Sequence, residues 1–471
     1  MAFENPTYHI PRRSVVGHEG AWVKSFNPPR DEPPTPELLL PTNPVPAFVV
    51  ENVPGATSPP QYWPEEDHLF EEDEELEDHE DHEEDEQQDI HYELYPNTLR
   101  INLMRTRNIQ MWDGKEIRFF LIGNPDVPAA ANGTISGPTI RIPRGAIFHG
   151  AVYGYGQSPH TIHWHGIEPT AMNDGVGHTA MEIGLYTYQF QPNHIGSYFY
   201  HCHRNTFQHF EFGLYGFLIV EPPDAYDPSD GKNVGGYPRR TAANLSQFTE
   251  FFGFKGGNLE SGDPHAMTVS YDVEALWVID DIDSTWRTQA HHARNTFAKH
   301  GDNPGVNDEF YQRPGESEFF SFHDYNPDYF VVTGVDFPGR VGSTVAIQPG
   351  ITIPPELNSG VTGMQVSINA KTNQNVLVRL LCAAYSKIIV TFPFDVVVIA
   401  VDGRALGVPP FGKYNQPYTV KAGIPIELST AQRKDVLFRT KEKLNVFAQV
   451  EFRHFINNTF LFRGKIPIII E

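Results

Sequence analysis

The sequence predicts an all-β protein of two Greek-key β-sandwich or barrel domains, preceded by an extended proline-rich arm and an acidic disordered run. Three observations predict this class. The 471 residues exceed what one hydrophobic core usually organises. The chain contains 40 prolines and 39 glycines, and long helical patterns are few. Short β-type segments separated by turn-forming residues recur from about residue 90 to residue 471.

Two segments for which no packed core is expected precede the first domain. Residues 1–64 form the arm, because their repeated prolines favour extended or polyproline conformations. Residues 65–89 form an acidic linker, in which self-repulsion of the carboxylates favours a solvated chain. His68, His79 and His82 lie in this linker and leave a second interpretation open, a weak reservoir of exchangeable metal. The formal charge of −24 argues against nucleic acid as a partner.

The two folded domains are expected at residues 90–235 and 236–471, and both consist of short strands. The strands predicted in the first are 92–107, 115–122, 139–142, 146–153, 161–166, 187–191, 197–201 and 214–221. Those predicted in the second are 363–369, 375–381, 387–392, 396–401, 418–420, 436–439 and 444–452. Residues 286–315 are polar and read as an irregular excursion between strands.

The two cysteines, Cys202 and Cys382, exclude a disulfide framework and are not expected to pair with each other. Cys382 lies in an apolar run, where a buried and inert thiol is the common case. Cys202 lies between two histidines, where a metal ligand is expected.

The residues suited to chemistry are concentrated in two short segments. These are His160-Thr161-Ile162-His163-Trp164-His165-Gly166 and Tyr200-His201-Cys202-His203, followed by His209. Residues two apart on a strand share a face, so His163 and His165 are expected to point one way. The same holds for His201 and His203, and Cys202 must then point the other way.

This alternation predicts two adjacent metal sites. Four imidazoles on one side suit a cluster of copper ions. A thiolate on the other side, together with His160 and His209, suits a trigonal blue-copper centre. Copper is therefore the expected cofactor. An electron that arrives at Cys202 has a backbone path through His201 or His203 to the cluster.

These segments resemble multicopper oxidases, the family that includes laccases. The resemblance covers most of residues 95–471 and is carried by four motifs: Ser136–Arg141, His163-Trp164-His165-Gly166, Asp174-Gly175 and Gly213–Gly216. It implies cupredoxin-like domains, with His163 as a type 2 copper ligand and with His165, His201 and His203 as type 3 ligands. It also implies a type 1 site at His160, Cys202 and His209, in which Leu214 stands at the axial position as a non-ligand.

The chain departs from the family pattern in three ways. Three-domain members usually place the type 1 cysteine in their third domain, but here it is Cys202 in the first. The loop from Cys202 to His209 is two residues longer than usual. A trinuclear cluster is expected to take eight histidines, and this domain supplies four. The histidines at 265, 291, 292, 300, 323 and 454 form no further His-x-His pair and are not counted as ligands.

The leading functional prediction is a copper oxidase. It would take single electrons from a small-molecule or metal-ion donor and pass them to dioxygen at a cluster completed in a homo-oligomer or by a partner chain. Asp174 and Glu182 are candidates to relay protons. Two alternatives stay open: a non-catalytic copper-binding or electron-transfer protein, and an enzyme that resembles copper nitrite reductase.

The compartment is a further expectation. The resemblance implies an extracytoplasmic protein, periplasmic or secreted. The first 16 residues contain no apolar stretch of the signal-peptide kind, so a cytoplasmic location also stays open. No run of some 18 apolar residues occurs, so no membrane span is expected.

Overall fold

The computed structural model describes most of the chain from Leu99 onward. The described residues are 99–123, 133–145, 148–154, 160–176, 184–203, 206–222, 233–234, 237–259, 263, 265–287, 325–352, 364–409 and 415–471. The predicted arm and acidic linker, and most of the excursion predicted at 286–315, lie outside these ranges.

The predicted all-β class is confirmed. The described residues contain many strands and few helical segments, among them the short helix α4 (Thr206–Glu211) and the 3₁₀ turn η3 (Ala171–Asn173). None of the helices among the described residues is long and apolar enough to cross a membrane.

The first half of the fold is a cupredoxin-like sandwich of two four-stranded sheets. One sheet has the order β2-β1-β4-β6, with β1 (Leu99–Gln110), β2 (Glu116–Gly123), β4 (Phe148–Gly154) and β6 (Gly184–Phe190). The other has the order β3-β8-β7-β5, with β3 (Gly137–Pro143), β5 (His163–His165), β7 (Gly196–His201) and β8 (Tyr215–Glu221). The sheets pack face to face, since Phe148 of β4 lies 5.2 Å from Trp164 of β5 between ring centroids.

The second half contains two larger sheets. Strands of the nine-stranded sheet are β13 (Val273–Ile282), β14 (Tyr329–Val332), β15 (Val335–Asp336), β17 (Met364–Gln365), β19 (Val376–Cys382), β21 (Val396–Val401), β22 (Arg404–Ala405), β23 (Tyr418–Val420) and β25 (Arg433–Phe438). Strands of the six-stranded sheet are β16 (Thr344–Ala346), β18 (Ile368–Ala370), β20 (Lys387–Thr391), β24 (Pro425–Leu428), β26 (Leu444–Arg453) and β27 (Phe460–Ile470). The largest hydrophobic cluster contains residues of both sheets and also Phe199 and Phe217 of the first half.

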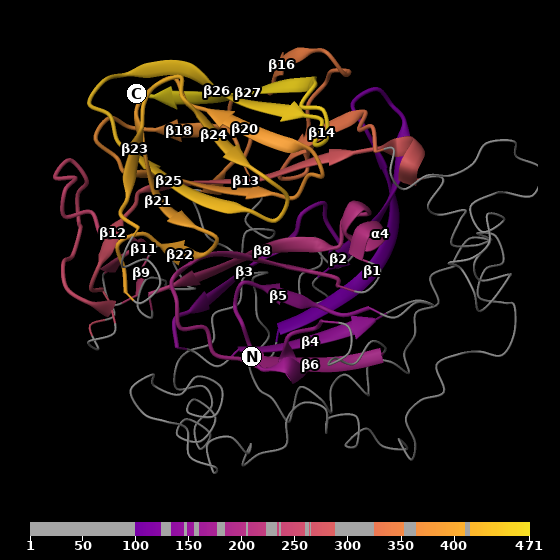
Figure 1. Ribbon diagram of the computed structural model, residues 1–471, viewed down its shortest axis with the longest axis horizontal. Coiled ribbons are helices and arrows are strands. Elements are labelled where there is room, and N and C mark those ends of the chain that lie inside the picture. The colour runs from indigo at the N-terminus through magenta and orange to yellow at the C-terminus, as the bar shows by residue number, and fades with distance from the viewer. Residues whose placement is uncertain are drawn as a thin grey trace, which may run out of the picture.

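Two short antiparallel pairs lie between the halves along the chain. They are β9 (Asn233–Val234) with β10 (Tyr237–Pro238), and β11 (Arg240–Ala242) with β12 (Thr268–Ser270). Figure 1 shows the indigo-to-magenta strands of the first half beside the orange-to-yellow strands of the second. The domain boundary at residue 235 stays a prediction.

Several predicted elements differ from the observed ones for identifiable reasons. The strand predicted at 363–369 divides into β17 and β18, which pair with different sheets. The buried strand β13 was not predicted, because the carboxylates of Asp280 and Asp281 interrupt its apolar pattern. Helix α4 was not predicted either, since six residues are too few for a helical period to be recognised.

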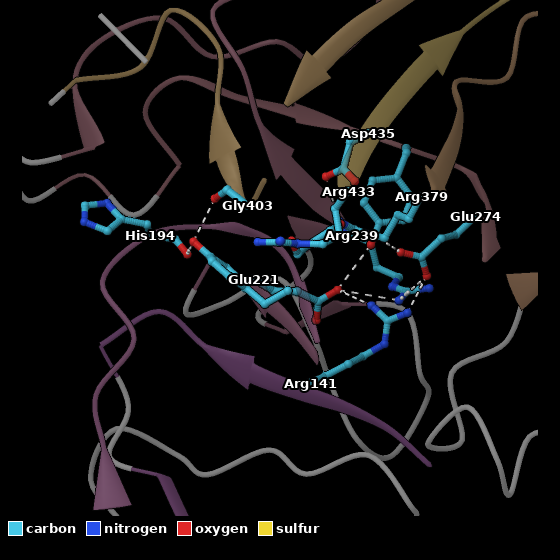
Figure 2. Close-up of polar contacts among 12 residues, drawn as sticks. Arg141, His194, Glu221, Arg239, Glu274, Arg379, Gly403, Arg433 and Asp435 are labelled. Atoms are coloured by element: carbon cyan, nitrogen blue, oxygen red, sulfur yellow. Dashed lines mark hydrogen bonds and ion pairs between the residues drawn. The ribbon is translucent and has the colours of Figure 1, made fainter. Parts of the chain in front are cut away.

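A buried ion cluster joins the two halves (Figure 2). Arg141 of β3 contacts Glu221 of β8 and Glu274 of β13. Arg239 and Arg379 also bind Glu274, at 3.2 Å and 2.6 Å. The three guanidinium groups hold the pKa of Glu274 far below its usual range, although burial alone would raise it. The cluster therefore fixes the first sandwich against the large sheet.

Candidate metal centre

The first candidate site brings together His160, Cys202 and His209, which are all buried. The sulfur atom of Cys202 lies 3.5 Å from Nδ1 of His160 and 3.3 Å from Nδ1 of His209. The two imidazole rings lie 4.5 Å apart between centroids. One thiol and two imidazole nitrogens thus converge on one point, as a trigonal copper site requires.

Helix α4 explains how the long loop after Cys202 returns to the site. The helix carries His209 in its last turn, so the extra residues are taken up in a helical turn. Leu214 then fixes both ends of the loop, because its backbone N–H donates to the carbonyl of His209 and its carbonyl accepts from the N–H of Cys202, each at 3.0 Å. The side chains of Leu214 and Cys202 belong to one hydrophobic cluster.

The second candidate site lies across the pairing of β5 with β7. His163 is opposite His201 and His165 is opposite Phe199 in this antiparallel register. The donor atoms of His163, His165 and His201 lie within 4.8 Å of one another. The ring of His203 is 5.3 Å from that of His163 between centroids, so the fourth predicted imidazole joins the group.

The two sites are separated by the alternation that the sequence predicted. The Cys202 sulfur lies with His160 and His209, whereas the flanking His201 and His203 lie with the second group. The strand itself ends at His201, so the alternation continues one residue past the last ladder position. The roles of these residues as copper ligands stay predictions.

Three imidazoles of the second group, those of His165, His201 and His203, have a lowered pKa, which favours the neutral form that binds metals. Burial lowers the pKa of His165 to about 3, helped by the nearby guanidinium of Arg433 and by His163. Burial also places the pKa of His201 well below its usual value, and burial and His163 lower that of His203. Neutral imidazoles offer a free lone pair. The residues present therefore fit a group of copper ions.

Asp174 positions His163. The Nδ1 atom of His163 is 2.8 Å from the backbone oxygen of Asp174 and 3.2 Å from its carboxylate. This contact leaves Nε2 of the ring for a metal and sets its orientation. Glu182, the other candidate for proton relay, lies outside the described residues.

Gly175 allows the loop of Asp174 to approach the metal-binding strand. Its φ is +68°, and a Cβ atom there would lie 1.8 Å from the backbone oxygen of Ile162. We expect Gly175→Ala to destabilise the protein by at least about 2 kcal/mol, through this clash and the left-handed φ. Copper bound per chain should fall with it, because Ile162 directly precedes His163. Denaturant unfolding and metal analysis measure both effects.

Gly423→Ala is the matched control, because Gly423 has a similar φ of +77° but no atom within 4 Å of a Cβ. The free energy of unfolding of this variant should fall by only about 1 kcal/mol, which is the cost of a left-handed backbone conformation for alanine. Equal losses for the two variants would refute the proposed close approach at Gly175.

Arg433 was not predicted to lie near the site. Its guanidinium lies 5.4 Å from the ring of Phe199, which stacks on His165 at 4.3 Å between centroids. Arg433 belongs to β25, far along the chain, so spacing in the sequence could not link it to His165. Its positive charge contributes to the low pKa of His165.

A buried acidic group beside helix α4 was also missed. Glu211 ends the helix, and Asp280 and Asp281 lie in β13. The hydroxyl of Tyr215 donates to Asp280, and Arg287 binds Glu211 at 3.0 Å. Burial and the neighbouring Asp281 carboxylate raise the pKa of Asp280 to about 8.

We expect Asp280→Asn to change how stability depends on pH. A carboxyl with a raised folded-state pKa stabilises the fold fully below its unfolded value near 4, and this contribution is lost as pH rises through about 8. Asparagine cannot ionise. Between pH 5 and pH 8 the unfolding free energy of the wild type should therefore fall relative to that of the variant, by at most about 1.4 kcal/mol per pH unit. Parallel profiles in urea unfolding would contradict this account.

The remaining histidines do not join either site where the structure describes them. His265 is buried beside β12, and its backbone N–H donates to Asp263. His454 lies at the β26–β27 turn and stacks on Phe455. The other four considered in the sequence, at 291, 292, 300 and 323, lie outside the described residues.

Comparison with known proteins identifies the region that carries the sites. Residues 121–225 match the family model described as multicopper oxidase. L-ascorbate oxidase of Cucumis sativus is 36% identical over 119 residues, which are 22% of this chain and 19% of that protein. A copper resistance protein A homolog of Pseudomonas syringae pv. tomato is 25% identical over 256 residues, 51% of this chain and 43% of its own.

Among solved structures, the blue copper oxidase from Nitrosomonas europaea superposes with a TM-score of 0.45 at 19% identity, covering 79% of this chain and 84% of that one. The chain spans less than half the length of the two curated relatives. The matched region nevertheless holds every described residue of both candidate sites. The resemblance found in the sequence is thereby confirmed: residues 121–225 match the model of the multicopper oxidase family, whose members bind copper.

Proposed function

We propose that this protein is a copper-dependent oxidoreductase that takes single electrons from a reducing substrate and passes them to dioxygen. The observation that carries the proposal is the position of Cys202. Its sulfur contacts His160 and His209, and its two chain neighbours belong to the group of four imidazoles. An electron acceptor and a dioxygen site would then be one residue apart.

In this proposal His160, Cys202 and His209 hold the type 1 copper. His163 holds the type 2 copper, and His165, His201 and His203 hold the type 3 ions. Copper, when bound, supplies one-electron exchange between its cupric and cuprous states. The chain supplies the link, because Nδ1 of His201 lies 2.9 Å from the backbone oxygen of Cys202. This contact shortens the path from the thiol to the cluster.

Leu214 supports a high reduction potential at the type 1 site. Its side chain is fully buried, packs in the same hydrophobic cluster as Cys202 and offers no donor atom. A copper ion held by His160, Cys202 and His209 would lie in this apolar surrounding, which would favour its reduced state, so the protein should accept electrons from weakly reducing donors. Asp174 is proposed to hand protons to reduced oxygen as well as to orient His163.

The cluster requires further ligands. The described residues contain one group of four imidazoles, which is half of the expected set. We propose that a second copy of the chain or a separate partner supplies the rest. Oxygen uptake should then depend on association, so native mass measurements and activity should fall together on dilution.

Copper counting with oxygen uptake tests the function. We expect intense blue absorption, about four coppers per completed cluster unit, and oxygen consumption with a phenol or Cu(I) as donor. His163→Ala should abolish oxygen uptake but keep the blue colour, and His454→Ala should change neither. A single blue copper per chain without oxygen uptake would reject the oxidase and favour electron transfer. Nitrite turnover without oxygen turnover would favour a nitrite reductase.

The compartment forms part of the proposal. Copper oxidases are normally exported, so we expect the protein outside the cytoplasm, in a periplasm or secreted. Fractionation of the native host, followed by detection of the full chain, tests this. Recovery with cytoplasmic markers would contradict it.

A further inference from the structure

The end of helix α4, which carries His209, is held by an arginine from the second half of the chain. Arg287 is buried, and its Nε donates to the Glu211 carboxylate at 3.0 Å. One terminal nitrogen of the same guanidinium group donates to the backbone oxygen of Glu211. The other donates to the backbone oxygen of Arg118 in β2 at 3.2 Å. Arg287 therefore ties the last residue of the helix, through both its main chain and its side chain, to the first sheet.

Helix α4 needs such a support, because it has six residues and a helix of this length is not stable by itself. The last carbonyl groups of a helix also find no partner within it. The Arg287 guanidinium supplies a donor to the oxygen of Glu211, and its positive charge is favourable at the C-terminal end of the helix dipole. The position of His209, which lies in the same last turn, thus depends on Arg287.

Arg287 is itself held in a fixed place. Its backbone N–H donates to the oxygen of Asp283 at 3.0 Å, and the carboxylate of Asp283 accepts from the backbone N–H of Trp286 at 2.7 Å. The guanidinium carbon lies 4.2 Å from the ring centroid of Phe119 and 5.5 Å from that of Phe212. A planar guanidinium group packed on aromatic rings loses little further freedom when it forms hydrogen bonds. It can therefore act as a rigid support.

The same support reaches the imidazole of His209 from a second side. Phe120, in the strand that Arg287 binds, lies 6.1 Å from the His209 ring in an edge-to-face arrangement. The Phe120 ring also stacks on Phe212 at 4.6 Å between centroids, and its backbone N–H donates to the oxygen of Phe212 at 2.8 Å. Loss of the Arg287 contacts would thus loosen both the helix and the ring that packs against His209.

We propose that Arg287 is a positioning residue that sets where the His209 imidazole lies relative to the Cys202 sulfur. Of the three residues at this site, His209 alone lies in a helix, and its Nδ1 is 3.3 Å from the sulfur. The inference rests on the proposed function, because it concerns the residues assigned to the type 1 copper. Arg287→Lys keeps the charge, but a compact ammonium group cannot bind the Glu211 carboxylate and two backbone oxygens in the planar arrangement of a guanidinium.

Arg287→Lys tests the inference in the copper-loaded full chain. We expect copper at the Cys202 site to be bound about tenfold more weakly, as when a residue that orients a metal-binding histidine is lost. The thiolate-to-copper absorption should also shift, because its energy depends on the arrangement of the ligands around the metal. Chelator competition and visible absorption measure the two effects. Glu211→Gln keeps the contact of Arg287 with the backbone oxygen of residue 211, so it should shift the absorption in the same direction by less.

Arg439→Lys is the matched control. Arg439 also donates to two backbone oxygens, those of Asn373 at 2.9 Å and Glu250 at 2.6 Å, and its guanidinium lies 3.4 Å from the ring centroid of Phe252. These contacts lie outside both candidate sites. The variant should therefore lose a comparable set of hydrogen bonds without a change in copper affinity or colour.

The metal-free chain gives a readout that does not depend on copper. The imidazole of His209 covers the Cys202 thiol, so a loosened helix should expose the thiol through local opening. Alkylation of Cys202 by iodoacetamide should be about tenfold faster in Arg287→Lys, while that of Cys382 should not change. Peptide mass spectrometry distinguishes the two cysteines.

The outcomes separate the inference from the function on which it rests. If Arg287→Lys does not fold, Glu211→Gln carries the test. Colour, copper affinity and Cys202 alkylation as in the wild type, in either folded variant, would overturn the role of Arg287 and leave the proposed function intact. Equal changes in Arg439→Lys would overturn it as well, since they would reflect a general loss of stability. A colourless wild type with faster alkylation in Arg287→Lys would reject the type 1 copper and retain Arg287 as the support of His209.

Discussion

Cys202→Ser is expected to lose the intense blue absorption of the copper-loaded protein completely. The colour of a type 1 site requires a thiolate bound to copper, and Cys202 is the only thiol within reach of His160 and His209 among the described residues. A serine hydroxyl is a poor ligand for copper in such a site. The variant should bind about one copper fewer per chain. Visible absorption and metal analysis measure both results.

The control is Cys382→Ser. Cys382 is equally buried, but its sulfur faces the backbone oxygens of Ala384 and Ser386 at 3.7 Å and 3.9 Å. A hydroxyl can donate to these oxygens, so this variant should fold and keep its colour. Circular dichroism of both variants separates loss of the site from loss of the fold. Persistent blue absorption in Cys202→Ser would remove the basis of the proposed electron path.

Glu274→Gln is expected to lower the free energy of unfolding by about 3–5 kcal/mol. The carboxylate is completely buried and binds Arg141, Arg239 and Arg379 (Figure 2). An amide of the same shape cannot compensate three buried guanidinium charges, and an uncompensated buried charge is strongly unfavourable. Chemical denaturation at pH 7 measures the loss.

Asp395→Asn serves as the comparison for this change. Asp395 pairs with Lys421 at 2.7 Å, but both side chains are largely exposed, at 49% and 73%. Exposed pairs of this kind contribute about 0–1 kcal/mol. If Glu274→Gln and Asp395→Asn lowered the free energy of unfolding by similar amounts, burial would not be the reason for the stabilisation by the Glu274 cluster.

The strands with the most regular composition could be predicted from the sequence. The strand Val396–Val401 is predicted at its observed bounds, because an unbroken run of apolar residues, mostly β-branched and flanked by polar turns, fits a strand buried on both faces. The convergence of His160, Cys202 and His209 was also expected. It follows from alternation over a few residues, which is a local property of extended chain.

Contacts between distant segments could not be predicted in this way. Arg433 approaches His165 only because β25 packs near β7. The residue pattern of one segment does not indicate which distant segment packs against it. The acidic group at Asp280 was hidden for a related reason. A carboxylate in a sequence predicts an exposed position unless a buried partner is known. The partner of Asp280 is Tyr215, which lies on another strand in the other half of the fold.

The ion cluster at Glu274 limits how freely this architecture could be taken apart by recombination. If the chain were cut before β13, the N-terminal fragment would contain the Arg141 guanidinium but not its partner Glu274. The C-terminal fragment would contain Glu274 with Arg379, but Arg141 would no longer help to balance the charge of the Glu274 carboxylate. Neither piece would be a self-sufficient module. A gene fusion that replaces the copper-type sandwich with another domain would need compatible charged residues at the contact with Glu274. The two halves of the fold are therefore expected to be inherited together.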